Sequence, residues 1–229
     1  MTISIIIPTL NEATHIGQLV EYLKKNANKD LREIIVADGG STDGTPQLAS
    51  TAGATTIIHC PEKGRSCQMN EGVEFSTGDI LYFVHADSIP PPSYIHDIQK
   101  SVNENFPIGC FRFKFNSDKK LLKFNAYMTR FDKMYCRGGD QTLFVKRDLF
   151  EELNGYRKEY KIMEEYDFIE RAKEKYPFKI IPKEVIVSAR KYEGRSWFRV
   201  MLANSVVFNM YKLGVAQDTM IKTYQRMLS

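Results

Sequence analysis

Three apolar strands early in this chain each run into a polar turn, and this pattern constrains the fold more than any other feature. The strands cover residues 5–7, 34–37 and 80–84, and the turns that follow them cover residues 8–12, 38–44 and 85–88. Strands that are apolar throughout are typical of parallel sheets with helices on both faces. Because ligands of open α/β sheets bind outside the carboxyl ends of the strands, we predict that the three turns form one ligand pocket.

The segments between these strands have the spacing of helices. Apolar residues recur at helical intervals after Asn11, which is predicted to cap the first helix. The further elements of this half are a strand at about 32–37, a helix from Thr45, a strand over 54–59, a helix over 66–75 and a strand over 79–84. Short turns and right-handed crossovers make this pattern a doubly wound sheet.

The second half of the chain changes character. Phe111, Phe113 and Phe115 alternate with polar residues, which predicts a strand with one solvated face. The remaining predicted elements are a helix over 121–135, strands over 142–145 and 179–181, and helices from Glu164, over 196–213 and over 219–227. We therefore predict an α/β fold: a doubly wound, mostly parallel mixed sheet flanked by helices, with a helical C-terminal end. Residues 1–229 are expected to form a single domain whose two halves meet at about residue 105.

Composition excludes several classes of protein. The chain is 43% hydrophobic and 26% charged, with a formal net charge of +4, which is ordinary for a globular protein and too weakly basic to indicate a partner. It lacks the glycine and aromatic motif of RNA-binding domains, so no nucleic acid is expected as a partner. Its four cysteines have no Cys-x-x-Cys spacing, which predicts reduced thiols rather than a structural zinc site.

The chain is expected to be cytoplasmic. It has no apolar run of the roughly 20 residues that span a bilayer, and it opens on a strand without a secretion signal. The stretch over 197–211 is rich in large apolar residues but is interrupted by Asn204 and Asn209. A helix packed on the core is the simplest interpretation of this stretch, and a homodimer contact or a peripheral membrane contact stays open.

The first turn combines a strand-ending proline with polar groups. Pro8 has no backbone N–H and therefore ends the hydrogen bonding of its strand. Thr9 and Glu12 can then face a nucleoside. The alternative is that Asn11 and Glu12 only cap and stabilise the helix that follows.

Asp38 ends the second strand directly before two glycines. A carboxylate at this point can accept a hydrogen bond from the N–H edge of a nucleobase. Gly39 and Gly40 allow the backbone to approach a ligand closely. Asp43 is instead predicted to be the N-cap of the next helix, because the Ser-Thr-Asp-Gly segment is typical of the start of a helix.

The third strand leads into His85, Ala86 and Asp87. Hard divalent cations prefer carboxylate and phosphate oxygens, so Asp87 is a candidate ligand for Mg²⁺ or Mn²⁺. His85 could bind the ion, support Asp87 or do neither. The alternative for Asp87 is a strand-end aspartate that caps a turn.

Together the four motifs resemble those of the family 2 glycosyltransferases of the GT-A fold. The motifs are Pro-Thr-Leu-Asn-Glu at 8–12, Asp-Gly-Gly-Ser-Thr-Asp-Gly at 38–44, His-Ala-Asp at 85–87 and the pair Glu164-Glu165, and the resemblance runs from Ile3 to about Phe168. The small soluble members linked to arsenosugar biosynthesis look most similar. The resemblance implies a metal-dependent, inverting enzyme that moves a sugar from a UDP- or GDP-linked donor to an acceptor hydroxyl.

The resemblance also implies a role for each motif residue. The nucleotide would be bound in the first half of the chain, about 1–105, by Pro8, Thr9, Asn11, Glu12, Asp38, Gly39, Arg65 and Ala86. Asp87 would hold the metal ion. In the acceptor and catalytic half, about 106–229, Glu165 would be the base, with Glu164 as the alternative. The sugars would contact Gly139, Asp140 and Gln141. Apart from the resemblance, the basic cluster of Arg190, Lys191 and Arg195 could close over the diphosphate as a clamp.

Two positions depart from the family pattern. Most relatives carry a second acidic residue where this chain has Gly39, and most end the acidic pair in aspartate where this chain has Glu165. Gly39 leaves recognition of the base to Asp38 alone. The longer side chain of Glu165 changes its reach.

Other interpretations stay open on the sequence alone. A sugar nucleotidyltransferase would need a glycine- and lysine-rich loop after the first strand, which residues 8–12 lack. A nucleotide-sugar-binding protein without activity is the non-enzymatic alternative. Acidic residues in the first turn of a helix, as at 164–165, need no functional explanation. A plain turn at 138–141 and a solvated surface for Arg65, Arg190 and Arg195 are the structural alternatives.

Overall fold

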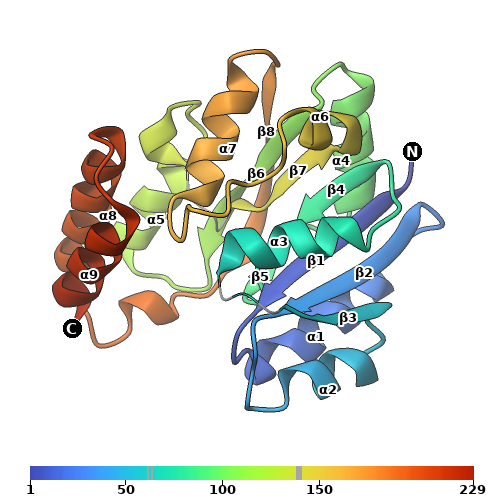
Figure 1. The fold of residues 1–229 in the computed structure, drawn as a ribbon, viewed down its shortest axis with the longest axis horizontal. Helices are drawn as coiled ribbons and strands as arrows, with labels where there is room; N and C mark the ends of the chain where they lie inside the picture. Colours follow the sequence, from blue (N-terminus) through green and yellow to red (C-terminus); the bar gives the residue numbers. More distant parts are fainter. Residues whose placement is uncertain (61, 63, 138–140) are drawn as a thin grey trace.

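The computed structural model describes residues 1–60, 62, 64–137 and 141–229. In this part of the chain a single mixed sheet has the strand order β3-β2-β1-β4-β7-β6-β8-β5, and helices cover it (Figure 1). The sheet runs through both predicted halves of the chain, and a functional division near residue 105 stays a prediction. None of the helices in the described ranges is long and apolar enough to cross a membrane.

The strands and helices have the following bounds. The strands are β1 (Ile3–Thr9), β2 (Leu31–Asp38), β3 (Thr56–His59), β4 (Ile80–Phe83), β5 (Ser88–Ile89), β6 (Ile108–Phe115), β7 (Leu143–Lys146) and β8 (Phe178–Val187). The helices are α1 (Ala13–Lys25), α2 (Thr45–Thr51), α3 (Arg65–Glu74), α4 (Tyr94–Asn103), α5 (Lys120–Met128), α6 (Arg147–Glu152), α7 (Glu164–Lys173), α8 (Trp197–Lys212) and α9 (Gln217–Leu228). Short 3-10 turns cover Met134–Cys136 and Arg190–Tyr192.

The sheet is parallel in its first half and mixed in its second. β3, β2, β1 and β4 pair in parallel, which brings their carboxyl ends to one edge. β7 runs antiparallel to both of its neighbours, β4 and β6, whereas β6 and β8 are parallel. The parallel half therefore places the first three polar turns together, as the sequence predicts.

Buried apolar side chains form a cluster on each face of the sheet, and the alternation of side chains along β1 explains why there are two. Ile3, Ile5 and Ile7 pack into one cluster with residues of α1 and α4, whereas Ile6 faces the opposite cluster with Met69 of α3. Successive side chains of a strand point to opposite faces, so a strand that is apolar at every position must be covered on both.

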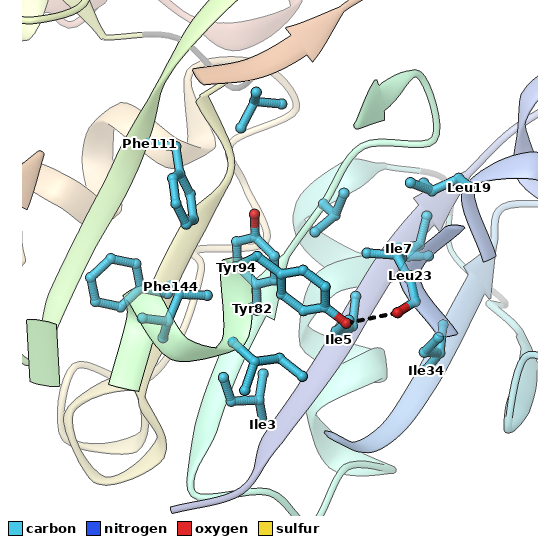
Figure 2. Close-up of a cluster of buried hydrophobic side chains, with 14 of the residues drawn as sticks. Ile3, Ile5, Ile7, Leu19, Leu23, Ile34, Tyr82, Tyr94, Phe111 and Phe144 are labelled. Atoms are coloured by element: carbon cyan, nitrogen blue, oxygen red, sulfur yellow. Dashed lines mark hydrogen bonds between the residues drawn. The ribbon is translucent and has the colours of Figure 1, made fainter. Parts of the chain in front are cut away.

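Two buried tyrosines in the cluster that contains Ile3, Ile5 and Ile7 have hydrogen-bond partners. Figure 2 shows the Tyr94 hydroxyl donating to the carbonyl oxygen of Leu23 at 3.0 Å. The Tyr82 ring stacks on Tyr94 at 5.9 Å between centroids, and its hydroxyl lies 3.0 Å from the Thr142 hydroxyl. These bonds offset the cost of burying the phenol oxygens beneath the site-bearing edge of the sheet.

Several predicted elements differ from the structure. The helix predicted over 121–135 ends at Met128, where the Thr129 hydroxyl bonds back to the carbonyl of Ala126 at 2.7 Å. The strand predicted over 179–181 extends over Phe178–Val187, because β6 pairs with it along its length. Three elements were not predicted, namely β5, α4 and α6.

Asn11 is not the cap of α1, so that prediction is wrong. The helix begins at Ala13, and Asn11 has a left-handed backbone with φ of 55°. The side-chain oxygen of Asn11 accepts the Thr42 N–H at 3.0 Å, and its own N–H donates to the Ser41 hydroxyl at 2.8 Å. Asn11 therefore joins the first polar turn to the second instead of capping its own helix.

Candidate active site

Asp38 lies at the end of β2, beside the end of β1. It is buried, and its Oδ1 accepts the Thr9 hydroxyl at 3.0 Å. Its Oδ2 accepts the backbone N–H groups of Gly40 at 3.1 Å and Ser41 at 2.8 Å, and the Ser41 hydroxyl bonds to Oδ1. The turn therefore fixes the orientation of the carboxylate, and a nucleobase would share it with Thr9 and Ser41.

Asp43 bonds to the first residues of two helices. Its Oδ1 accepts the N–H and hydroxyl of Thr45, the first residue of α2, at 3.1 and 2.6 Å. Its Oδ2 accepts the N–H of Ala13, the first residue of α1, at 3.0 Å. These hydrogen bonds hold the pKa of Asp43 below its ordinary value. The N-cap of α2 is Gly44, so the prediction of an N-cap at Asp43 is wrong by one residue, although Asp43 does bond to the first residue of that helix.

Gln68 of α3 is a structural residue of this edge that the sequence reasoning missed. Its side-chain amide is buried and donates to the carbonyls of Thr9 at 2.6 Å and Ala37 at 2.8 Å. A Cβ atom added at Gly39 would lie 3.0 Å from the same amide nitrogen. Gly39 thus makes room for Gln68, and a glutamine between buried Cys67 and Met69 is the sequence signal for it.

Replacing Gln68 with leucine should lower the free energy of unfolding by about 1–3 kcal/mol, because two buried carbonyls lose their amide donor. Urea denaturation followed by circular dichroism would measure this change. Gln47→Leu, at an exposed position of α2, is the matched control and should stay within about 0.5 kcal/mol of the wild type. Equal effects of the two substitutions would show that Gln68 does not hold the two strand ends.

Asp87 meets the first turn through an arginine from far along the chain. The guanidinium of Arg190 donates to both carboxylate oxygens of Glu12, at 2.9 and 2.6 Å. One of its nitrogens also lies 3.0 Å from Asp87 Oδ2. Asp87 and Glu12, which follow neighbouring parallel strands, therefore point at one shared cation and not into the packed interior.

The chemistry of these two carboxylates suits a divalent cation. Mg²⁺ is commonly held by one or two protein carboxylates, with substrate phosphates completing its coordination. The guanidinium already shows that positive charge fits between Asp87 and Glu12. Among the described residues no group of three or more His, Cys, Asp or Glu side chains is arranged to hold an ion by itself.

The acidic pair that begins α7 is buried, and its two members face different partners. Glu164 Oε1 lies 3.3 Å from the guanidinium of Arg65, the first residue of α3. Glu165 Oε1 lies 3.3 Å from His85 Nε2, two residues before Asp87. The helix start thus places one carboxylate beside Arg65 and the other beside the His-Ala-Asp motif.

These partners shift the pKa values of the two carboxyl groups in opposite directions. Burial raises the pKa of Glu164, and the charge of Glu165 adds to this effect although Arg65 opposes it. Burial would also raise the pKa of Glu165, but the contact with His85 and the charges of His85 and Arg65 outweigh it, so that the pKa lies below its ordinary value. The carboxyl of Glu165 therefore stays ionised at a lower pH than that of Glu164.

Asp167, one turn into α7, forms ion pairs with two arginines. It is buried between Arg157, at 3.0 Å, and Arg171, at 2.9 Å. A carboxylate held by two guanidinium groups serves the packing of the helix.

The remaining residues predicted for the site lie in several different parts of the structure. Pro8 and Ala86 are buried in the strand ends. Gln141 is buried, donates to the carbonyl of Phe111 at 3.2 Å and lines a small pocket that also includes Glu165. Gly139 and Asp140 lie outside the described residues. Arg195 donates to the carbonyl of Leu228 at 3.0 Å, so the structure holds it at the end of α9 and not at Asp87.

Comparison with known proteins gives a family match over most of the chain. A family model described as Glycosyl transferase family 2 matches residues 4–161. A PGL/p-HBAD biosynthesis glycosyltransferase of Mycobacterium tuberculosis is 29% identical over 184 residues, which cover 72% of this chain and 67% of the relative. A glucosyl-3-phosphoglycerate synthase of Mycolicibacterium smegmatis is 35% identical over 97 residues, 39% of this chain and 32% of the relative.

Solved structures confirm the predicted fold class. The glucosyl-3-phosphoglycerate synthase of Mycobacterium tuberculosis, in complex with Mn²⁺, UDP-glucose and phosphoglyceric acid, superposes with a TM-score of 0.66 at 16% identity, covering 93% of this chain and 80% of that one. TarS of S. aureus gives a TM-score of 0.66 at 16% identity, covering 100% of this chain and 71% of that one. Likeness at these identities concerns the GT-A fold and not the substrate.

Proposed function

The chain belongs to the family 2 glycosyltransferases and uses a nucleotide-sugar donor, and we propose that its reaction is metal-dependent and inverts the configuration of the transferred sugar. One observation carries this proposal. The short segment from His85 to Asp87 contacts Glu165 at one end and, through Arg190, Glu12 at the other. A proton acceptor and a cation-binding carboxylate thus share one strand end, where a donor and an acceptor would meet.

Uracil is the proposed base of the donor nucleotide, and guanine is the alternative. Support comes from the solved relative whose complex contains UDP-glucose and Mn²⁺. The buried Asp38 carboxylate would accept an N–H at the edge of the base, beside the Thr9 hydroxyl that already donates to it.

In the proposed reaction Glu165 takes the proton of the acceptor hydroxyl while that oxygen attacks the anomeric carbon. The bond from the anomeric carbon to the diphosphate oxygen breaks, and its electron pair leaves with the nucleoside diphosphate. A divalent cation on Asp87 would neutralise the charge that develops on this leaving group. Positioning by the buried α7 start supplies the remaining catalysis, since both reactants must be held in line.

Arg190 would exchange partners during the cycle. A cation bound to Asp87 would compete with the guanidinium for the carboxylate, because both carry positive charge. Arg190 would then lie next to the diphosphate and donate charge-assisted hydrogen bonds to it. Its position in a short turn, on a side chain that is about half exposed, allows this change.

Arg190→Ala should weaken UDP binding in the presence of Mn²⁺ by about tenfold, because a hydrogen bond to a charged group contributes about 1.5–3 kcal/mol. Isothermal titration calorimetry would measure it. Arg195 lies at the end of α9, so Arg195→Ala should bind UDP with a Kd within about twofold of that of the wild type. Tighter UDP binding by Arg190→Ala would instead show that the guanidinium only competes with the metal ion.

Release of the nucleoside diphosphate from a panel of UDP- and GDP-sugars, with Mn²⁺ and with excess chelator, would test the function. A metal-dependent glycosyltransferase should hydrolyse one donor slowly without an acceptor and only when the ion is present. A sugar nucleotidyltransferase would release pyrophosphate from a nucleoside triphosphate, and a binding protein would bind the donor without turnover.

A further inference from the structure

Large apolar side chains on and after α5 are exposed to solvent. They share the region between β6 and the 3-10 turn at Met134–Cys136 and are Leu121, Phe124, Tyr127, Phe131 and Tyr135. Leu122 is the residue of α5 that is buried. Monomeric proteins rarely expose a contiguous apolar patch of this kind unless it binds something.

Four of these side chains, from Leu121 to Phe131, form one stripe. Leu121, Phe124 and Tyr127 follow each other at intervals of three residues, which places neighbours on the same side of a helix. The Tyr127 ring meets the Phe131 ring edge to face at 5.8 Å between centroids. The Arg130 guanidinium lies 3.7 Å from the centre of the Tyr127 ring and covers its other side.

Exposed apolar residues also lie on α8, which is a neighbour of α5. Figure 1 shows α5 and α8 side by side at one end of the molecule, and the Asn125 amide of α5 donates to the Met201 sulfur of α8 at 3.3 Å. Phe198 and Leu202, one turn apart on α8, are also exposed. The C-terminal helices therefore pack against α5 with part of their apolar surface and leave another part open.

Basic side chains interleave with the stripe. Residues 118–135 contain the basic residues Lys119, Lys120, Lys123, Arg130 and Lys133, and two acidic residues, which leaves a net charge of +3. The acidic ones are paired, Asp118 with Lys123 at 2.9 Å and Asp132 with Lys173 at 2.6 Å. Aromatic and basic side chains in this combination are typical of helices that lie in the interface of a membrane.

We propose that this α5 face, meaning the five exposed apolar residues with Lys120, Lys123, Arg130 and Lys133, docks on a membrane surface rich in anionic lipid. The aromatic rings would lie at the level of the headgroups, and the basic groups would contact lipid phosphates. A second copy of this chain suits the face less well, because two copies of the same face would bring like charges together. The inference is independent of the proposed reaction.

Sedimentation with lipid vesicles tests this docking in the full-length protein. The wild type should bind vesicles that contain phosphatidylglycerol and should bind pure phosphatidylcholine vesicles much less. Phe124→Ser/Phe131→Ser should lower the partition coefficient for the anionic vesicles by about tenfold, since it removes two apolar groups from the contact. Lys120→Glu/Lys123→Glu should lower it at least as much and should abolish its dependence on salt.

Matched variants elsewhere on the surface provide the controls. Leu48→Ser/Phe75→Ser removes side chains that are 44% and 55% exposed, close to the 57% and 43% of Phe124 and Phe131. Lys25→Glu/Lys29→Glu, near the end of α1, changes the net charge by the same amount as the lysine pair on α5. Both controls should bind vesicles like the wild type, and thermal melts should show that every variant is folded.

Three outcomes would overturn the docking proposal. The first is equal binding of the wild type to anionic and zwitterionic vesicles. The second is equal loss of binding in the control variants. The third is a dimer that light scattering detects and Phe124→Ser/Phe131→Ser dissolves, with no binding to vesicles, because the face would then serve a second copy of the chain.

Discussion

Asp87→Ala is expected to abolish metal-dependent donor binding, with a loss in affinity of about 100-fold or more. The carboxylate is the strand-end group that would hold the ion, and a bound ion contributes several kcal/mol to the binding of a diphosphate. In the structure Asp87 has a single cationic neighbour, Arg190 at 3.0 Å, among the ion pairs of the described residues. Calorimetric titration of UDP in the presence and absence of Mn²⁺ would measure the loss.

Asp79→Ala is the control for this substitution, because Asp79 lies just before the other end of β4. Its carboxylate accepts the Thr2 N–H at 2.6 Å, away from the polar turns. The control should bind UDP and Mn²⁺ like the wild type, with some loss of stability. If Asp87→Ala kept its Mn²⁺-dependent binding, the ion would be held elsewhere and the proposed mechanism would fail.

Glu165→Gln is expected to lower kcat by about 10²–10⁴-fold while the Kd of the donor stays within about twofold. The range is the usual contribution of a general base. The amide keeps the shape of the side chain and its contact with His85 but cannot take a proton from the acceptor hydroxyl. Single-turnover transfer with a saturating donor, together with calorimetry of donor binding, would separate the two effects.

Glu164→Gln distinguishes the two members of the pair. Because burial raises the pKa of Glu164, a larger share of this carboxyl is already protonated and cannot take the proton of the acceptor, and the substitution should lower kcat by about tenfold at most. A larger loss in Glu164→Gln than in Glu165→Gln would assign the base to Glu164 and overturn the assignment made from the contact with His85.

The pH profile offers a second readout for Glu165. A general base works in its deprotonated form, so activity is lost as the pH falls through its pKa. The contact with His85 lowers the pKa of Glu165, which extends activity to lower pH than an ordinary glutamate would allow. Replacing His85 with asparagine should therefore shift the acidic limb of the kcat/KM profile to higher pH.

Local patterns predicted the elements that carry the site. The apolar runs before Asp38 and Asp87 read correctly as buried parallel strands, because strands covered on both faces need apolar residues at every position. Parallel strands bring their carboxyl ends to one edge, so the polar turns had to meet. The weaker elements were missed because their local signal is short: β5 has two residues, and the three prolines at 90–92 obscured the start of α4.

The sequence by itself determined which residue types stand at the ends of the strands, because period and polarity along the chain decide which segments become buried strands and where each ends. Only the tertiary structure decided which side chains meet there. Arg190 reaches Glu12 across 178 residues, Gln68 joins β1 to β2 from α3, and His85 finds Glu165 rather than Glu164. Such pairings depend on how distant elements pack against each other, and no periodicity within a single segment encodes that packing.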